Sequence, residues 1–305
     1  MKIGVSSYSM ENLRRQKGIS VFEMIDLAVE LGFASIEFTD VYAPEGKDKI
    51  EQAKDIAAYA KEKGIEVSTY TIGADLLLKD EAEEFERLKG ELKIAEALGV
   101  NKMRHDICWG FPAEMKTKRG FDDALAIVAP RARKVTDYAE TLGIKTMFEN
   151  HGFFCQDSDR VEKLLNAVGS ENFGLLADLG NFLCADDNPA VAIGKLAPYA
   201  IHVHIKDFFV KNGMLPDPGN GWFRSRAGNY LRGTVVGHGD VPVKQCIETL
   251  KRAGYNGSYS IEFEGVEENV FALKTGLENL NRYFSEPRIC PSRTSVSAST
   301  TPFPA

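Results

Sequence analysis

The sequence has few cysteines, no surplus of basic residues and no long hydrophobic run. Its five cysteines are widely spaced and form no C-x-x-C pair, which favours reduced thiols in a cytoplasmic protein. No uncharged apolar stretch approaches the roughly 20 residues that a membrane-spanning helix needs, and the first ten residues lack the apolar centre of a signal peptide. The net charge of −7 argues against binding to a nucleic-acid backbone. We therefore expect a cytoplasmic protein without a membrane span or a nucleic-acid partner.

One sequence unit recurs along the chain: an amphipathic helical stretch ends in glycine, and a short apolar, β-branched run follows at once. Gly32, Gly64, Gly99 and Gly143 occupy such positions, where glycine commonly ends a helix. The pattern predicts eight strands, at 2–8, 34–39, 65–71, 100–106, 144–151, 174–180, 200–207 and 258–265. The clearest helices are predicted at 19–31, 122–142, 159–168, 190–196, 243–253 and 267–284.

Strict alternation of strands and helices predicts parallel pairing through right-handed crossovers, and eight such units close a (β/α)₈ TIM barrel. The alternative is an open, doubly wound sheet. Against that alternative, no G-x-G-x-x-G follows the first strand, where residues 5–9 read VSSYS and a dinucleotide site would need its glycines. We therefore predict an α/β fold with a single barrel domain over residues 1–285.

Two segments do not follow the repeating pattern of helices and strands. Residues 208–236 form a long insertion rich in Gly, Pro and Arg after the seventh strand. In a barrel this insertion lies at the active-site rim, where it is either a lid, a partner surface or a plain solvated loop. Residues 286–305 are rich in Pro, Ser and Thr, and this composition predicts a disordered tail.

Potential metal ligands gather at the ends of four consecutive predicted strands. In a barrel, functional side chains project from the carboxyl ends of the strands. Strand five ends in Glu149 and His151, and strand six in Asp178; strand seven carries His202 and His204, and strand eight Glu262 and Glu264. The two-residue period of a strand places each of these pairs on one face, so that periodicity alone does not choose within a pair.

A shared divalent cation accounts for acidic residues inside otherwise apolar strands, because an unpaired buried carboxylate is costly. Carboxylates and an imidazole suit Mn²⁺, Mg²⁺ or Co²⁺, and we favour Mn²⁺. Each residue also has a purely structural explanation. Asp178 could cap the following helix, and either histidine could be a core histidine with satisfied hydrogen bonds. Their joint occurrence favours the metal site.

The chain resembles the xylose isomerase-like TIM barrel superfamily, particularly its sugar phosphate isomerase/epimerase family, from its start to about Phe284. The matching segments are IEF at 36, FENHG at 148, ADLGN at 177, HVHIKD at 202, VGHGDVP at 236 and GSYSIEFEG at 257. The resemblance implies a metal held by Glu149, Asp178, His204 and Glu262. It also implies proton abstraction next to a carbonyl, through an enediolate, with Glu149 and Glu262 as the acid/base pair.

Further residues are candidates for contacts with a small carbohydrate substrate: Arg104, His151, Asn181, His202 and Lys206. The structural alternative for Arg104 and Lys206 is an ion pair with Glu37 or Asp106. Ketose 3-epimerases have a histidine at the position of Asn181 and an acid at that of Cys155. The long insertion resembles branches that act on larger glycosides, including C-glycoside deglycosidases with a small partner subunit.

These features predict a metal-dependent sugar isomerase or epimerase, either as a homo-oligomer or with a small partner subunit. A lyase resembling inosose dehydratases or C-glycoside deglycosidases is the alternative, because elimination begins with the same enediolate. An AP-endonuclease relative and a non-catalytic sugar-binding barrel are further alternatives.

Overall fold

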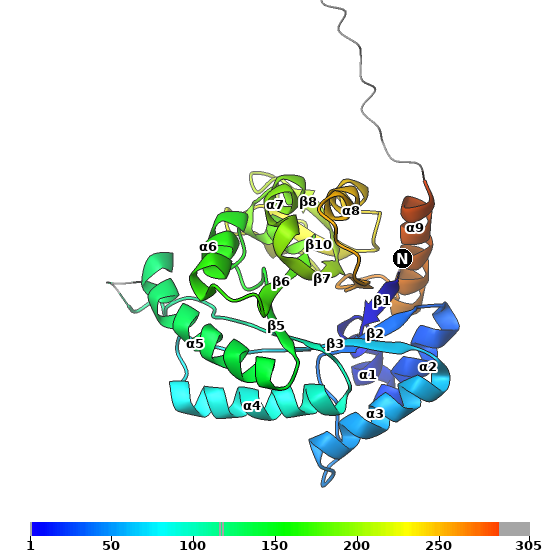
Figure 1. Ribbon diagram of the computed structural model, residues 1–305. Helices are drawn as coiled ribbons and strands as arrows, with labels where there is room; N and C mark the ends of the chain where they lie inside the picture. Colours follow the sequence, from blue (N-terminus) through cyan, green and yellow to red (C-terminus); the bar gives the residue numbers. More distant parts are fainter. Residues whose placement is uncertain (1, 116, 118, 287–305) are drawn as a thin grey trace, which may run out of the picture.

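Eight parallel strands close into a barrel in the computed structural model, which describes residues 2–115, 117 and 119–286. The order around the barrel is β1-β11-β7-β6-β5-β4-β3-β2, and helices surround the strands (Figure 1). The predicted (β/α)₈ barrel is therefore confirmed. The barrel strands are β1 (Ile3–Ser6), β2 (Ser35–Phe38), β3 (Glu66–Ile72), β4 (Lys102–His105), β5 (Lys145–Glu149), β6 (Phe173–Asp178), β7 (Ala200–Ile205) and β11 (Tyr259–Ile261).

Helices connect the strands as the sequence pattern predicts, and glycines in the left-handed conformation end several of them. Gly32 and Gly64 have φ angles of 92° and 75°, which glycine adopts without the steric penalty of a Cβ atom. At the other end of α2, Ser20 and Glu23 form a reciprocal capping box. The helices are α1 (Glu11–Lys17), α2 (Val21–Leu31), α3 (Lys49–Lys63), α4 (Glu81–Ala97), α5 (Phe121–Thr141), α6 (Ser158–Val168), α7 (Pro189–Leu196), α8 (Val243–Arg252) and α9 (Asn269–Ser285).

The first strand is shorter than predicted. It ends at Ser6, and the 3₁₀ helix η1 (Ser7–Met10) follows directly and leads into α1. The Ser6 hydroxyl accepts a hydrogen bond from the backbone N–H of Tyr8, which starts the turn. As a result, Tyr8 lies beyond the end of the strand, on the side of the barrel where the carboxyl ends of the strands meet.

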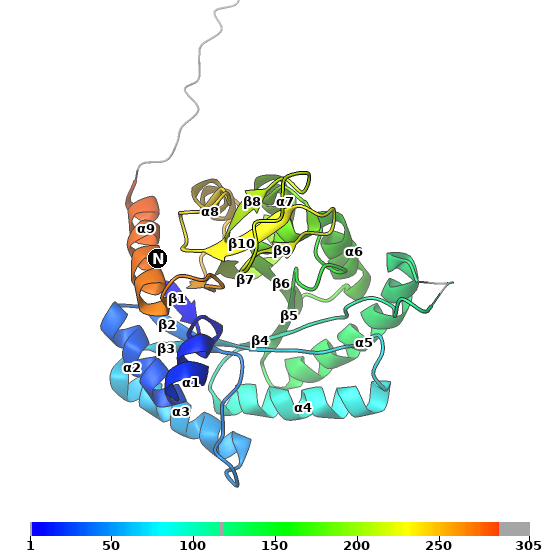
Figure 2. The ribbon, with the colours of Figure 1, turned by 180° about the vertical axis from the view of Figure 1, so that it is seen from behind.

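The predicted insertion contains a small antiparallel sheet. It has the order β8-β10-β9, with β8 at Asp207–Lys211, β9 at Phe223–Arg224 and β10 at Tyr230–Thr234. A parallel bridge between Gly233 and Gly265 joins this sheet to the segment after β11. Figure 2 shows the sheet on the near side of the molecule, close to the labels of β6 and β7.

Three further predictions concern the C-terminal tail, the extent of the domain and membrane-spanning helices. The tail predicted to be disordered, 286–305, lies outside the described residues except for Glu286. The extent of the domain, 1–285, stays a prediction. Among the described residues, no helix combines the length and the apolar character that crossing a membrane requires.

Candidate metal centre

Four barrel strands bring four potential ligands together at their carboxyl ends. Glu149 ends β5, Asp178 ends β6, His204 lies near the end of β7, and Glu262 follows β11. One ligand atom from each residue lies within 4.8 Å of the others, and all four side chains are buried. We call these four residues the metal cluster. Of the pairs that strand periodicity left open, the cluster contains Glu149, His204 and Glu262, whereas His151, His202 and Glu264 lie outside it.

The metal cluster contains two buried polar atoms without a hydrogen-bond partner in the described part of the chain. They are Nδ1 of His204 and Oδ2 of Asp178. Nδ1 lies 3.5 Å from Oε1 of Glu262, 3.8 Å from Oε1 of Glu149 and 3.9 Å from Oδ2 of Asp178. Oδ2 of Asp178 also lies 3.7 Å from Nζ of Lys206, without a hydrogen bond. A buried polar atom without a hydrogen bond costs about 1–3 kcal/mol. A divalent cation bound between these atoms would remove that cost, and three carboxylates with one imidazole suit such an ion.

Asp178 fulfils the capping role that its sequence context suggested, and its second oxygen faces the cluster. Its Oδ1 accepts hydrogen bonds from the backbone N–H groups of Gly180 and Asn181, at 2.8 and 2.9 Å, and so stabilises the start of the 3₁₀ helix η2 (Asn181–Ala185). Its Oδ2 is left facing the cluster. The capping interaction therefore orients the carboxylate and leaves one oxygen available as a ligand.

The two glutamates of the cluster are held ionised by neighbouring cations. Burial alone would raise the pKa of Glu149, but Arg104 and His204 lower it well below the usual range. Nε and Nη2 of Arg104 donate to Oε2 of Glu149, at 2.9 and 2.5 Å. Glu262 is also buried, and Lys206 and His204 lower its pKa to about 2. Both glutamates are therefore carboxylates at neutral pH.

The pKa values of Asp178 and His204 are both raised. Burial raises the pKa of Asp178 to about 7, and the negative charges of Glu149 and Glu262 add to this effect, which outweighs the opposing influence of Lys206. Burial lowers the pKa of His204, but the carboxylates of Glu37 and Glu262 raise it well above the usual value. Binding of a cation here would displace any proton that these two residues hold.

A polar cavity of about 240 Å³ opens above the metal cluster. Two glutamates of the cluster form part of its wall, and the cations at the cavity are already engaged by carboxylates. Arg104 contacts Glu149 and also Asp106, at 3.4 Å. Nζ of Lys206 lies 2.8 Å from Oε2 of Glu262 and 3.1 Å from Oε2 of Glu264. The lining residues are Tyr8, Thr39, Thr71, Gly73, Arg104, Asp106, Glu149, His151, Lys206, Glu262 and Glu264.

Three of the predicted substrate contacts, Arg104, His151 and Lys206, line this cavity, whereas Asn181 and His202 do not. Nδ2 of Asn181 donates to Oε1 of Glu149 at 2.9 Å, so Asn181 orients a residue of the metal cluster. The structural alternative, an ion pair with Glu37 or Asp106, is confirmed for Arg104, which pairs with Asp106. The ion pairs of Lys206 go to other carboxylates, those of Asp178, Glu262 and Glu264. Sequence reasoning missed Tyr8, Thr39 and Thr71 as lining residues, although each lies at or just after the end of a strand.

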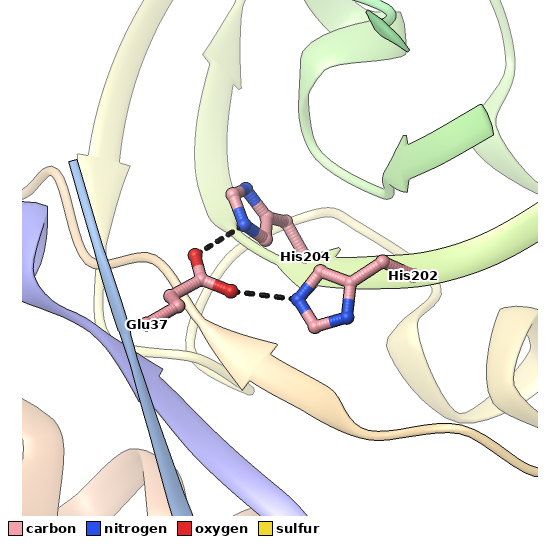
Figure 3. Close-up of side chains that lie close together, drawn as sticks. All are labelled: Glu37, His202 and His204. Atoms are coloured by element: carbon pink, nitrogen blue, oxygen red, sulfur yellow. Dashed lines mark hydrogen bonds and ion pairs between the residues drawn. The ribbon is translucent and has the colours of Figure 1, made fainter. Parts of the chain in front are cut away.

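Glu37 binds two histidines instead. Figure 3 shows its carboxylate reaching from β2 to His202 and His204 on β7. Oε2 of Glu37 lies 2.6 Å from Nε2 of His202, and Oε1 lies 2.5 Å from Nε2 of His204. All three side chains are almost completely buried. His202 is therefore a core residue in contact with Glu37.

The sequence matches a family model described as xylose isomerase-like TIM barrel over residues 25–283. The chain belongs to the xylose isomerase-like TIM barrel family. Within 159 residues it is 32% identical to the rhizopine catabolism protein MocC of Rhizobium meliloti, a match that covers 49% of the chain and 48% of the relative. It is 25% identical over 134 residues to the inosose dehydratase of Geobacillus thermodenitrificans, covering 43% and 44% respectively. The chain thus spans about half the length of the curated relatives it matches.

Several solved structures superpose on more than nine-tenths of the chain. The probable 3-DHS dehydratase AsbF of Bacillus anthracis has a TM-score of 0.71 at 19% identity, with 92% of this chain and 99% of that chain covered. D-psicose 3-epimerase of Clostridium cellulolyticum H10 has a TM-score of 0.70 at 18% identity, covering 93% and 99%. An IOLI protein with a bound zinc atom has a TM-score of 0.69 at 17% identity, covering 94% and 100%. At these identities, the similarity shows the fold.

Proposed function

We propose that this xylose isomerase-like barrel is a divalent-metal-dependent isomerase or epimerase of an uncharged sugar or polyol derivative that carries a carbonyl group. The observation that carries the proposal is the metal cluster at the base of a polar cavity, with two ionised glutamates facing the same space. A polar cavity lined by hydroxyl, carboxylate and cationic groups suits a substrate with many hydroxyl groups. The proposed ion is Mn²⁺, with Mg²⁺ and Co²⁺ as alternatives that the same ligands accommodate.

The charges of the cavity support an uncharged substrate. Arg104 and Lys206 are the arginine and lysine side chains among the lining residues, and each contacts two or more carboxylates. A phosphate group would have to displace these carboxylates from a cation before it could bind. The cavity therefore favours a neutral ketose, inosose or keto-glycoside over a sugar phosphate.

Glu149 and Glu262 are the proposed acid/base pair. Because their pKa values are lowered, both are ionised and able to accept a proton from a carbon next to the substrate carbonyl. A bound divalent cation would stabilise the negative charge that develops on the carbonyl oxygen by several kcal/mol. Return of this proton to the neighbouring carbon would give the isomer. Delivery of a solvent proton through the other glutamate to the opposite face, with release of the abstracted proton to solvent, would give the epimer. Tyr8, Thr39 and His151 are placed to hydrogen-bond substrate hydroxyls.

The test is solvent deuterium uptake next to the carbonyl of a panel of ketoses, inososes and 3-keto-glycosides, read by mass spectrometry after removal of the metal. We expect uptake with Mn²⁺ and none with chelator. Glu149→Gln and Glu262→Gln should each lower the exchange rate by about 10²–10⁴-fold, the usual contribution of an acid/base group. Glu264→Gln is the matched control, since Glu264 lines the cavity outside the metal cluster and should retain most of the rate. Metal binding without exchange across the panel would contradict the proposal.

A lyase is the second candidate, and the position of Lys206 favours it. Its ammonium group lies at the cavity wall beside Glu262, where it can donate a hydrogen bond to a leaving hydroxyl. An inosose dehydratase is among the sequence relatives, and elimination starts with the same proton abstraction. The products decide between the two: an isomer keeps the mass of the substrate, whereas dehydration lowers it by one water.

A further inference from the structure

We infer that Glu37 is a positioning residue that fixes the ring of His204 so that its Nδ1 faces the metal site. The inference rests on the metal centre of the proposed function and extends it to a residue outside the metal cluster. Glu37 lies in β2, and its carboxylate meets His202 and His204 on β7, 165 and 167 residues further along the chain (Figure 3). β2 and β7 are not neighbours in the barrel, so the contact spans its interior.

The hydrogen-bond chemistry of Glu37 determines the tautomer of His204. An ionised carboxylate only accepts hydrogen bonds, so that Nε2 of His204, at 2.5 Å from Oε1, must carry the hydrogen. In the neutral ring, the lone pair then resides on Nδ1. This is the nitrogen that has no hydrogen-bond partner among the described residues and lies 3.5–3.9 Å from the three carboxylates of the cluster.

His202 holds the other oxygen of Glu37. Its Nε2 lies 2.6 Å from Oε2 of Glu37 and 3.3 Å from the hydroxyl of Ser260 on β11. With both oxygens engaged by rings from the same strand, the carboxylate cannot rotate away from His204 without leaving buried polar atoms unpaired. A histidine that binds a metal usually donates its second N–H to such an acceptor, and removal of the acceptor costs about 10–100-fold in metal affinity.

The first test measures the dissociation constant of Mn²⁺ by competition with a fluorescent chelator. We expect Glu37→Leu to weaken binding by about 10–100-fold. Glu37→Gln should lie closer to the wild type, because its amide oxygen can still accept from Nε2 of His204. Glu84→Leu is the matched control: Glu84 is a buried carboxylate of α4 that binds Arg87 and should leave the Mn²⁺ affinity unchanged. Melting temperatures in chelator show whether each variant is folded.

The second test needs no variant. A long-range ¹H–¹⁵N spectrum of the zinc-loaded wild type should show His204 with its hydrogen on Nε2 and a bare Nδ1. The positioning role would be overturned if Nε2 of His204 carried no hydrogen. It would also be overturned if a folded Glu37→Leu variant kept the Mn²⁺ affinity of the wild type. If the wild type itself binds no metal, the proposed metal centre is wrong. That outcome is distinct from one in which the metal binds but Glu37 has no positioning role.

Discussion

Asp178 and His204 differ from the two glutamates of the cluster, because their pKa values are raised and those of the glutamates are lowered. Burial and two neighbouring carboxylates raise the pKa of Asp178 to about 7, and nearby carboxylates outweigh burial to raise the pKa of His204 above its usual value. A metal ion binds the deprotonated ligands, so it must displace any proton that these two residues hold. Binding of a cation to the cluster would therefore be coupled to proton release.

Metal affinity should consequently depend on pH. Asp178 carries its proton below about pH 7 and loses it above, so affinity rises as the pH increases towards 7 and more gradually beyond. Below pH 7 we expect the dissociation constant for Mn²⁺ to increase about tenfold per pH unit for each proton released. Calorimetric titration at pH 6, 7 and 8, in buffers with different ionisation enthalpies, measures both affinity and proton release. Equal affinities at pH 6 and pH 8 would show that neither residue exchanges a proton for the metal.

The sequence allowed the four residues of the metal cluster to be proposed, because each lies near the end of a predicted strand. Their assignment within each pair depended on resemblance to a family. The contact of Glu37 with two histidines could not be predicted, since the residues are more than 160 positions apart and lie on non-adjacent strands. No local pattern encodes a hydrogen bond across a barrel interior.

At the scale of elements, the helix ends were predicted well and the insertion was not. Glycines such as Gly32 and Gly64 mark helix ends by a local conformational requirement. In the insertion, β8 and β10 pair across a separation of 18 residues, Asn212 to Asn229. A hairpin with a two-residue turn has a sequence signal, whereas a connection of this length has none.

Gly233 in β10 should be the position that is most sensitive to a small substitution in this sheet. A Cβ atom there would lie 2.0 Å from the carbonyl oxygen of Glu264 and 2.6 Å from its carbonyl carbon. Gly233→Ala therefore forces β10 away from the segment after β11, at a cost of about 1–3 kcal/mol.

Gly90→Ala provides the matched control. Gly90 lies inside α4, and the space that a Cβ atom would occupy there is open, so alanine should stabilise the helix by about 1 kcal/mol. Urea unfolding of both variants gives the two free energies. Destabilisation of similar size in both would mean that the contact between Gly233 and Glu264 has no special importance.

At the scale of the whole molecule, the number of repeating strand-helix units allowed the fold to be predicted. Eight strand-helix units predict closure, and β1 pairs with β11 in register from Ile3 opposite Tyr259, so that the first and last barrel strands meet. Closure places the ends of β5, β6, β7 and β11 around one point. The position of the site therefore follows from the topology. The choice of substrate depends on the loops at the carboxyl ends of the strands, and the repeating pattern does not determine those loops.

Because the metal cluster joins four strands of one closed barrel, metal binding should stabilise the entire fold. A ligand that binds only the folded state adds about 2.7 kcal/mol at a concentration of 100 times its dissociation constant. The melting temperature should therefore rise on addition of Mn²⁺ and return with chelator. Glu149→Gln, which removes one ligand charge, should show a smaller rise, whereas Glu264→Gln, outside the cluster, should respond like the wild type. If all three proteins gain the same stability, the ion binds elsewhere, and the buried charges of the cluster would require another explanation.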